Sequence, residues 1–323
     1  MKKTLSIFFF SLFCLLLLSF PLTASASTLT VSSTIASSIG RYQISTIQGN
    51  LNLDDNPVTN GLVAIQTMAS TNVMFLRTVN TGSNPPEFKA EIQSIYLSDA
   101  QGNPVSVATK GTLSYFTVTL KNNQPAPLDT LVAISIFDNN NCPIGFSSAQ
   151  TAIPQGTSVV ILSIPITTWA ISGRATVFAT LCSKLPSTGG VPYCTEASGF
   201  FTINGQQGAD PPTTPNGNQG QYALSFRIPP KASTTIPYTI YMSSAYTGLQ
   251  AFSNAAFSVY QPGDFNGDSK LNYLDIAQFM DAYINYYQHN PFDSRADFDS
   301  NGKVDYRDIS AFMDAYIIYY SHV

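Results

Sequence analysis

The chain has 323 residues, of which 44% are hydrophobic and 11% are charged, and its formal net charge is −4. This length exceeds that of a typical single domain and is enough for several small modules. The basic residues form no cluster that could meet phosphates, so nucleic acid is excluded as a partner.

The first segment, residues 1–26, has the organisation of a signal peptide. Lys2 and Lys3 precede an apolar run from Leu5 to Phe20, and the small residues Ala24-Ser25-Ala26 follow as a cleavage site. An uncleaved anchor is the alternative, because the run approaches the roughly 20 residues that span a bilayer. No second long apolar run follows, so we expect a secreted or cell-surface protein with no membrane span after cleavage.

Residues 27–84 contain short alternating runs, such as 41–47 and 61–66, that are separated by turn sequences. This pattern is typical of β-strands. The stretch 47–82 resembles small surface modules of the carboxypeptidase-regulatory or bacterial Ig-like kind. We therefore predict a small β domain over residues 27–84.

A second β-rich region covers residues 85–204. Runs rich in Val, Ile, Thr and aromatic residues predict strands over 88–97, 113–121, 130–137, 158–166 and 174–181. Five or more strands joined by short turns predict a sandwich. The sequences at 115–122 and 153–158 resemble adhesion-type Ig-like domains of prokaryotic surface proteins.

The segment 205–221 is rich in Gly, Gln, Pro, Thr and Asn, which is typical of a flexible linker. Strand-like runs return in residues 222–261, where 238–244 echoes 175–180. Because about forty residues are few for an independent sandwich, we expect this segment to pack on the 85–204 sandwich.

The cysteines beyond the signal segment are Cys142, Cys182 and Cys194. Cys182 and Cys194 could close a short disulfide loop in an oxidising compartment, which would leave Cys142 over. Three small buried thiols are the alternative, and the sequence does not decide between the two.

The last region, 262–323, contains two loops with the spacing of calcium ligands. From Asp264 onward there are ten acidic and four basic residues, a net charge of −6. Calcium takes six to eight oxygens, which such a loop supplies from positions 1, 3, 5, 9 and 12 and from the carbonyl of position 7. The predicted ligands are Asp264, Asn266, Asp268, Lys270 through its carbonyl, Asn272 and Asp275, and then Asp297, Asp299, Asn301, Lys303 through its carbonyl, Asp305 and Asp308.

Position 6 differs between the two loops. The turn there requires a positive φ, for which glycine is suited. Gly302 occupies this position in the second loop, whereas Ser269 occupies it in the first. We therefore expect two calcium ions, with the second loop better matched and the first binding more weakly.

The two loops are 33 residues apart, and each leads into a matching segment, 276–287 or 309–320. Apolar residues recur there at helical spacing, so we predict two helices that pack together through them. These residues are Ile276, Phe279, Met280, Tyr283 and Tyr287, and their counterparts Ile309, Phe312, Met313, Tyr316 and Tyr320. The duplication of loop and helix resembles the dockerin domains that attach secreted proteins to cohesin-bearing scaffolds.

The resemblance implies a small all-α domain that binds a cohesin-like protein or surface scaffold. In cellulosomal dockerins, loop positions 10 and 11 are often Ser-Thr and largely determine the partner. Here these positions hold Tyr273-Leu274 and Tyr306-Arg307. This departure leaves a different cohesin-like receptor, or docking within the same chain, as alternatives.

The chain from the signal segment to Asp264 contains no recognisable arrangement of catalytic residues. It has no histidine, which excludes a Ser-His-Asp triad, a Cys-His pair or a histidine-ligated zinc there. Glycosidases need only two carboxylates, but the candidates form no recognisable pair: Glu87, Glu91, Asp99, Asp129, Asp138, Glu196 and Asp210. Trp169 with Tyr193 or Phe200 could stack on a sugar, although a lone Trp is more often part of a core.

The sequence therefore predicts a mainly β chain of Ig-like or β-sandwich modules followed by a small all-α dockerin-like domain. We expect an exported, non-catalytic protein that attaches to a cohesin-like partner or surface assembly. Two alternatives stay open: a carbohydrate-binding component of a polysaccharide-degrading complex, with a polysaccharide as partner, and a polysaccharide hydrolase without a recognised motif.

Overall fold

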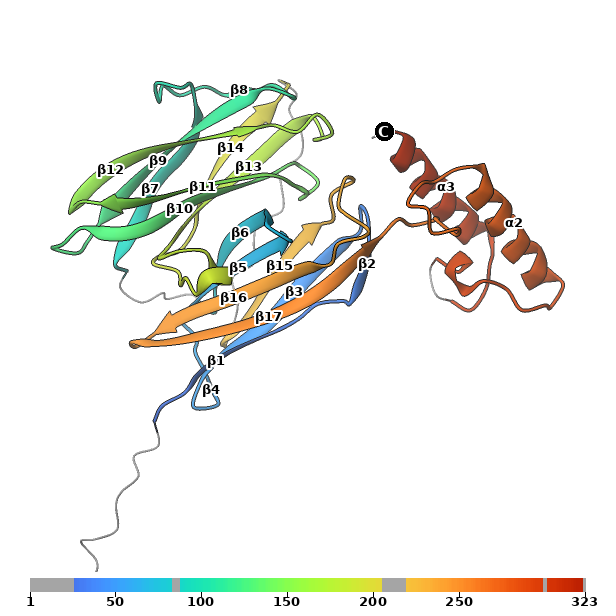
Figure 1. Cartoon of the computed structure of the whole chain (residues 1–323), viewed down its shortest axis with the longest axis horizontal. Coiled ribbons are helices and arrows are strands. Elements are labelled where there is room, and N and C mark those ends of the chain that lie inside the picture. Colours follow the sequence, from blue (N-terminus) through green and yellow to red (C-terminus); the bar gives the residue numbers. More distant parts are fainter. Residues whose placement is uncertain (1–25, 83–87, 205–218, 299–300, 322–323) are drawn as a thin grey trace, which may run out of the picture.

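The computed structural model describes residues 26–82, 88–204, 219–298 and 301–321 (Figure 1). Within them the chain is mainly β, and its two long helices both lie in the C-terminal region, which confirms the predicted fold class. Nearly all of the predicted signal peptide and most of the predicted linker lie outside the described residues. No described helix is both long and apolar enough to cross a membrane.

Two sheets form a first sandwich, which we call sandwich 1. One sheet has the order β1-β3-β15, with β4 paired to β3, and the other has the order β2-β17-β16-β5-β6. Alternate residues of both sheets point into one core, as the two-residue period of a strand requires. The strands are β1 (Leu29–Thr34), β2 (Ser38–Gly40), β3 (Ile44–Leu53), β4 (Asn56–Pro57), β5 (Leu62–Ala69), β6 (Asn72–Asn80), β15 (Gln221–Arg227), β16 (Tyr238–Tyr246) and β17 (Leu249–Tyr260).

Sandwich 2 lies between β6 and β15 in the sequence. Its sheets have the orders β11-β10-β13-β14-β8 and β12-β9-β7. The five strands predicted for this region are all present, and β8, β11 and β14 are additional. The strands are β7 (Ala90–Ser98), β8 (Val107–Ala108), β9 (Leu113–Asn122), β10 (Leu128–Phe137), β11 (Pro143–Ile153), β12 (Gly156–Pro165), β13 (Gly173–Cys182) and β14 (Ala197–Ile203), and a short 3-10 helix, η1 (Pro186–Thr188), follows β13.

The strands of residues 222–261 pair with a different sandwich from the one expected. β15 pairs with β3, β16 with β5 and β17 with β2, so all three belong to the sheets of sandwich 1. The segment therefore completes sandwich 1, and it meets the 85–204 sandwich through contacts such as the N–H of Arg227, which donates to the carbonyl oxygen of Asn141 at 2.8 Å. A period-two pattern identifies strands but not their partners, and the echo of 175–180 in 238–244 reflects strand composition alone.

Buried side chains join the two sandwiches. The Phe75 and Phe137 rings lie 5.7 Å apart between centroids. Arg77 of β6 is 1% exposed and donates from Nε to Oε2 of Glu196 at 2.8 Å. Its guanidinium also lies over the Phe178 ring, 3.2 Å from the centroid. The contact between the sandwiches thus contains both an aromatic cluster and an almost fully buried ion pair.

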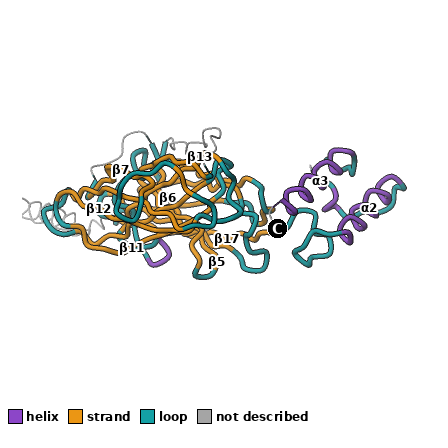
Figure 2. The backbone as a smooth tube through the Cα atoms, turned by 90° about the horizontal axis from the view of Figure 1, so that it is seen from above, coloured by secondary structure: helices purple, strands orange, loops and turns teal. Residues whose placement is uncertain are grey.

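The C-terminal helices are α2 (Tyr273–Tyr287) and α3 (Tyr306–Ser321), with a short 3-10 helix, η2 (Ser294–Ala296), between them. Each begins three residues before its predicted start, because the last residues of the loop form the first helical turn. Asn272 caps α2 by accepting the Leu274 N–H at 2.9 Å. Figure 2 shows both helices at one end of the molecule, beyond sandwich 1.

The helix contact is narrower than the sequence predicts. Phe279 and Phe312 are buried and stack with their centroids 4.7 Å apart. Ile276, Tyr283, Ile309 and Tyr316 are partly buried against this core. Met280, Tyr287, Met313 and Tyr320 are exposed, so the prediction that they pack the helices together is wrong. Two short helices enclose too little volume to cover so wide a stripe.

Candidate metal centre in two acidic loops

The first loop is organised by backbone N–H groups that bond to its acidic and amide side chains. Asp264 accepts the N–H of Gly267 at 2.7 Å on Oδ1 and that of Ser269 at 2.7 Å on Oδ2. Asp275, which is fully buried, accepts the N–H of Phe265 at 2.9 Å and that of Asn272 at 2.8 Å. The predicted position 12 therefore ties the beginning of the loop to its end.

The second loop repeats this arrangement. Asp297 accepts the N–H of Asn301 at 3.0 Å and that of Gly302 at 2.7 Å. Asp308 is fully buried and accepts the N–H of Phe298 at 2.7 Å and that of Asp305 at 2.8 Å. The predicted ligand Asp299 lies outside the described residues.

Position 6 adopts the left-handed conformation in both loops, as predicted. Ser269 has a φ of +63° and Gly302 a φ of +81°. A side chain at such a φ is strained, because Cβ crowds the following carbonyl oxygen. Ser269 is therefore strained at the position where Gly302 is not, which gives the weaker binding expected of the first loop a geometric basis.

The donor set of both loops consists of oxygen atoms. In the first loop these belong to three carboxylates, two amides and one backbone carbonyl, a combination that suits a hard cation such as Ca²⁺. Within the described part of the chain, no group of three or more carboxylates is already arranged as a metal cage. The loops therefore have the ligand chemistry for calcium, and the ligand assignments stay predictions.

Arg295, two residues before the second loop, contacts the first loop. Its Nη2 donates to the carbonyl oxygen of Phe265 in the first loop at 2.9 Å. The same side chain pairs with Asp293, which lowers the pKa of that carboxyl below its usual range. Nothing in the sequence pattern singled out Arg295. Its role depends on the packing of the second loop against the first.

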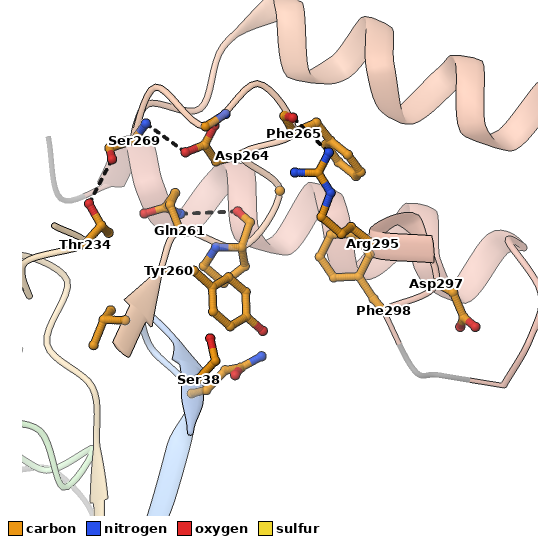
Figure 3. Close-up of a pocket in the computed structure, with 15 residues that line it drawn as sticks. Ser38, Thr234, Tyr260, Gln261, Asp264, Phe265, Ser269, Arg295, Asp297 and Phe298 are labelled. Carbon is orange, nitrogen blue, oxygen red and sulfur yellow. Dashed lines mark hydrogen bonds between the residues drawn. The ribbon is translucent and has the colours of Figure 1, made fainter. Parts of the chain in front are cut away.

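A cleft of about 580 Å³ lies where the loops meet sandwich 1 (Figure 3). Asp264, Ser269, Arg295 and Asp297 line it from the loops, and residues of β17 and of the loop containing Thr234 line it from sandwich 1. The first residue of each predicted calcium loop thus borders the same cleft.

Large apolar side chains cover the outside of both helices in matching positions. Tyr273 and Tyr306, at loop position 10, are 75% and 71% exposed. The helical residues that follow them repeat this exposure. We call the two sets the docking stripes: Tyr273, Leu274, Met280, Ile284 and Tyr287 on α2, and Tyr306, Met313, Ile317 and Tyr320 on α3.

The described carboxylates considered for glycosidase chemistry are engaged in hydrogen bonds or ion pairs, or lie apart from one another. Asp99 closes an exposed turn by accepting the N–H groups of Gln101 and Asn103. Asp138 is buried at a turn, and burial raises its pKa. Glu91 pairs with Lys121, and Glu196 pairs with Arg77. Asp129 is exposed in β10, and Glu87 and Asp210 lie outside the described residues.

The aromatic and cysteine candidates are mostly internal. Trp169 and Tyr193 are partly buried against the core of sandwich 2, whereas Phe200 is half exposed with the Arg174 guanidinium 4.2 Å from its centroid. Cys142, Cys182 and Cys194 are buried free thiols, which is the alternative to a disulfide between Cys182 and Cys194. Burial raises the thiol pKa of all three.

Comparisons with solved structures give only distant likenesses. The C-terminal domain of wzt is 14% identical with a TM-score of 0.30, and the match covers 46% of this chain and 84% of that one. Alkylpurine DNA glycosylase AlkC of Pseudomonas fluorescens is 14% identical with a TM-score of 0.27, covering 37% and 31%. A β-glucosidase of Listeria innocua is 15% identical with a TM-score of 0.24, covering 39% and 17%. The chain thus spans under a third of the latter two proteins, and scores this low carry no functional argument.

Comparison with protein families gives a match in the region of the two loops. Residues 262–316 match the family model of the dockerin type I domain. Among curated proteins, none matches the chain. The matched residues contain both acidic loops, all of α2 and most of α3. This β-rich chain therefore carries a dockerin type I domain in its C-terminal region.

Proposed function

We propose that the chain is an exported, non-catalytic protein that attaches to a cohesin-type partner through its calcium-loaded dockerin domain. The observation that carries this proposal is the pair of loops in register, each closed by a buried aspartate and followed by an exposed docking stripe. Dockerin domains bind cohesins, and the family match covers both loops. The two sandwiches are then the part of the chain that the dockerin domain attaches to the partner.

Two calcium ions would bind through the twelve predicted ligands. A bound ion would offset the mutual repulsion of the loop carboxylates. Asp275 and Asp308 would act from inside the domain, because both are buried and held by backbone N–H groups. The first site would be the weaker one because of Ser269.

The docking stripes are the surface proposed for the partner. A soluble domain this small rarely exposes so many large apolar side chains together without a binding role. Tyrosines at loop position 10 suit an interface, since they combine a large apolar ring with a polar hydroxyl. They also differ from the Ser-Thr pair of cellulosomal dockerins, so the partner would be a cohesin with an apolar complement.

A pull-down with immobilised mature protein tests this function. Extracellular and envelope proteins would be captured in calcium, in chelator, and with Asp264→Ala combined with Asp297→Ala. Asp281→Ala with Asp314→Ala is the matched control, because it removes the same charge from equivalent exposed positions on the helices. We expect a cohesin-type partner in the calcium and control lanes only. An empty calcium lane would refute the docking function.

We also propose a domain division that follows the strand pairing. Sandwich 1 would comprise residues 27–82 and 219–261, sandwich 2 residues 88–204, and the dockerin domain residues 262–323. This division is supported by the pairing of β15, β16 and β17 with strands of the first segment. Limited proteolysis in calcium should leave fragments with these boundaries, and cleavage within β16 or β17 before any other site would contradict it.

Carbohydrate binding by sandwich 2 is a second candidate function. One observation favours it: Phe200 of β14 presents an exposed ring beside Arg174 of β13. Aromatic faces of this kind can stack on a sugar, whereas Trp169 and Tyr193 are engaged with the core. A glycan array with the full chain, beside Phe200→Ala, tests it. Binding that Phe200→Ala abolishes would support this function, and an array without signal would dismiss it.

A further inference from the structure

The dockerin domain is joined to sandwich 1 by a short and restrained connection. Gln261, Pro262 and Gly263 alone separate the end of β17 from Asp264. Gln261 is buried and accepts a hydrogen bond from Nη1 of Arg41 at 3.2 Å. Gly263 has a φ of +83°, and a Cβ there would lie 3.0 Å from Leu271 and 3.1 Å from Phe312. This connection lacks the freedom of a polar linker.

A hydrogen bond between hydroxyl groups adds to this connection (Figure 3). Thr234, in the loop before β16, lies with its Oγ1 2.8 Å from Oγ of Ser269 in the first calcium loop. The hydroxyl of Tyr42 lies 3.5 Å from the carbonyl oxygen of Ile318 near the end of α3. Sandwich 1 therefore contacts the first loop and the end of the second helix.

The equivalent position of the second loop has no such contact. Gly302 has no side chain, and a Cβ placed on it would meet no described atom within 4 Å. The repeat is thus broken at the position whose side chain bonds to Thr234 of sandwich 1. A glycine at position 269 would relieve the strained φ but would remove the hydroxyl that reaches Thr234.

Ser269 also contacts the first predicted calcium ligand. Its N–H donates to Oδ2 of Asp264 at 2.7 Å, while its hydroxyl bonds to Thr234. A single residue therefore connects the carboxylate at loop position 1 with sandwich 1. Any rearrangement of Asp264 on loss of the ion would also move the hydroxyl of Ser269.

We propose that calcium in the first loop fixes the dockerin domain on sandwich 1 through the Ser269–Thr234 hydrogen bond. This rests on the calcium binding proposed above. Without the ion, repulsion among the loop carboxylates opens the turn and withdraws the hydroxyl from Thr234. In the structure α2 lies on the side away from sandwich 1 and α3 on the nearer side (Figures 1 and 2). The ion would hold this arrangement.

Thermodynamic linkage makes this coupling reciprocal. If calcium favours the contact, the contact must favour calcium by the same factor. Thr234→Val removes the hydroxyl and keeps the shape of the side chain, at a residue that contributes no calcium ligand. Since a hydrogen bond of this kind contributes modestly to stability, we expect the calcium affinity of one site to fall about fivefold.

Calcium titration calorimetry of the full chain tests the proposal. Thr235→Val is the matched control, because among the described residues the Thr235 hydroxyl bonds within its own loop, to Ser233 at 3.3 Å. Thr234→Val should weaken one site and Thr235→Val neither. Equal affinities in the two variants would overturn the coupling while leaving calcium binding intact. A wild-type chain that binds no calcium would overturn both the coupling and the calcium assignment.

Hydrogen exchange gives a second readout that does not depend on affinity. In the wild-type chain, chelation should increase exchange in residues 231–236 as well as in 264–275. Ser269→Gly should still bind calcium, since glycine suits position 6, but exchange in 231–236 should no longer respond to the ion. A response to calcium that persists unchanged in this variant would overturn the proposal.

Discussion

Replacing Glu196 with Gln isolates the contribution of the buried ion pair between the sandwiches. The substitution keeps the size of the side chain but removes the negative charge beside Arg77, which is 1% exposed. Glu196 also accepts the N–H of Thr78 at 2.9 Å, a bond that the amide oxygen of Gln can retain. The substitution therefore removes the charge and one hydrogen bond, because the amide nitrogen would face Nη2 of Arg77, which is also a donor.

The expected cost follows from the burial of the guanidinium. Removing one partner of a buried ion pair destabilises a protein by about 3–5 kcal/mol, because the remaining charge stays desolvated. The Glu196 side chain is 13% exposed, so water reaches part of the pair. We therefore expect a loss of about 3 kcal/mol, the lower end of that range.

Urea unfolding in the presence of calcium measures this loss, with Glu91→Gln as the control. Glu91 pairs with Lys121 at 3.1 Å, but the two side chains are 43% and 46% exposed. An exposed pair contributes less than about 1 kcal/mol. The reasoning is refuted if Glu196→Gln costs no more than Glu91→Gln at an unchanged denaturant slope.

Three further predictions concern the dockerin domain and the thiols. Chelation should unfold residues 264–323 and leave the sandwiches intact; helical circular dichroism that persists in excess chelator would contradict this. Phe312→Ala should destabilise the dockerin domain by about 3–5 kcal/mol in a thermal melt with calcium, because it removes the ring stacked on Phe279. Met313→Ala is its exposed control, and equal melting temperatures would disprove the proposed core. Cys142, Cys182 and Cys194 should resist alkylation at pH 8 until the protein unfolds, since burial raises their pKa and depletes the reactive thiolate. Rapid labelling of the native protein, or fewer than three reactive thiols after unfolding, would contradict three buried free thiols.

The loops and helices of the dockerin domain could be predicted because their determinants are local. The spacing from Asp264 to Asp275 and from Asp297 to Asp308 fixes which oxygens share a loop, and glycine at 302 indicates the turn. The helical period likewise places Phe279 and Phe312 on the buried face. The same period could not predict that Met280 and Met313 lie outside the buried face, because it does not determine how wide the helix contact is.

The partners of the late strands and the contacts between modules could not be predicted, because they are non-local. Tyr238 pairs with Ala69, and no sequence feature of either segment identifies the other as its partner. No pattern in the sequence relates the polar residues Thr234 and Ser269 to each other. The serine at position 6 was identified as a departure, but its hydrogen-bond partner could be found only in the structure.

The insertion of sandwich 2 between β6 and β15 determines how the chain carries mechanical load. Tension applied at the dockerin domain enters through Gln261 into β17, which is held between β2 and β16 in the five-stranded sheet. From β17 the tension can pass to β1 through the strands of sandwich 1. It need not pass through sandwich 2, because the chain enters sandwich 2 after β6 and leaves it before β15, and both of these strands belong to sandwich 1. Sandwich 2 therefore lies beside the line of force, and a protein held by its dockerin domain can be pulled without stretching it.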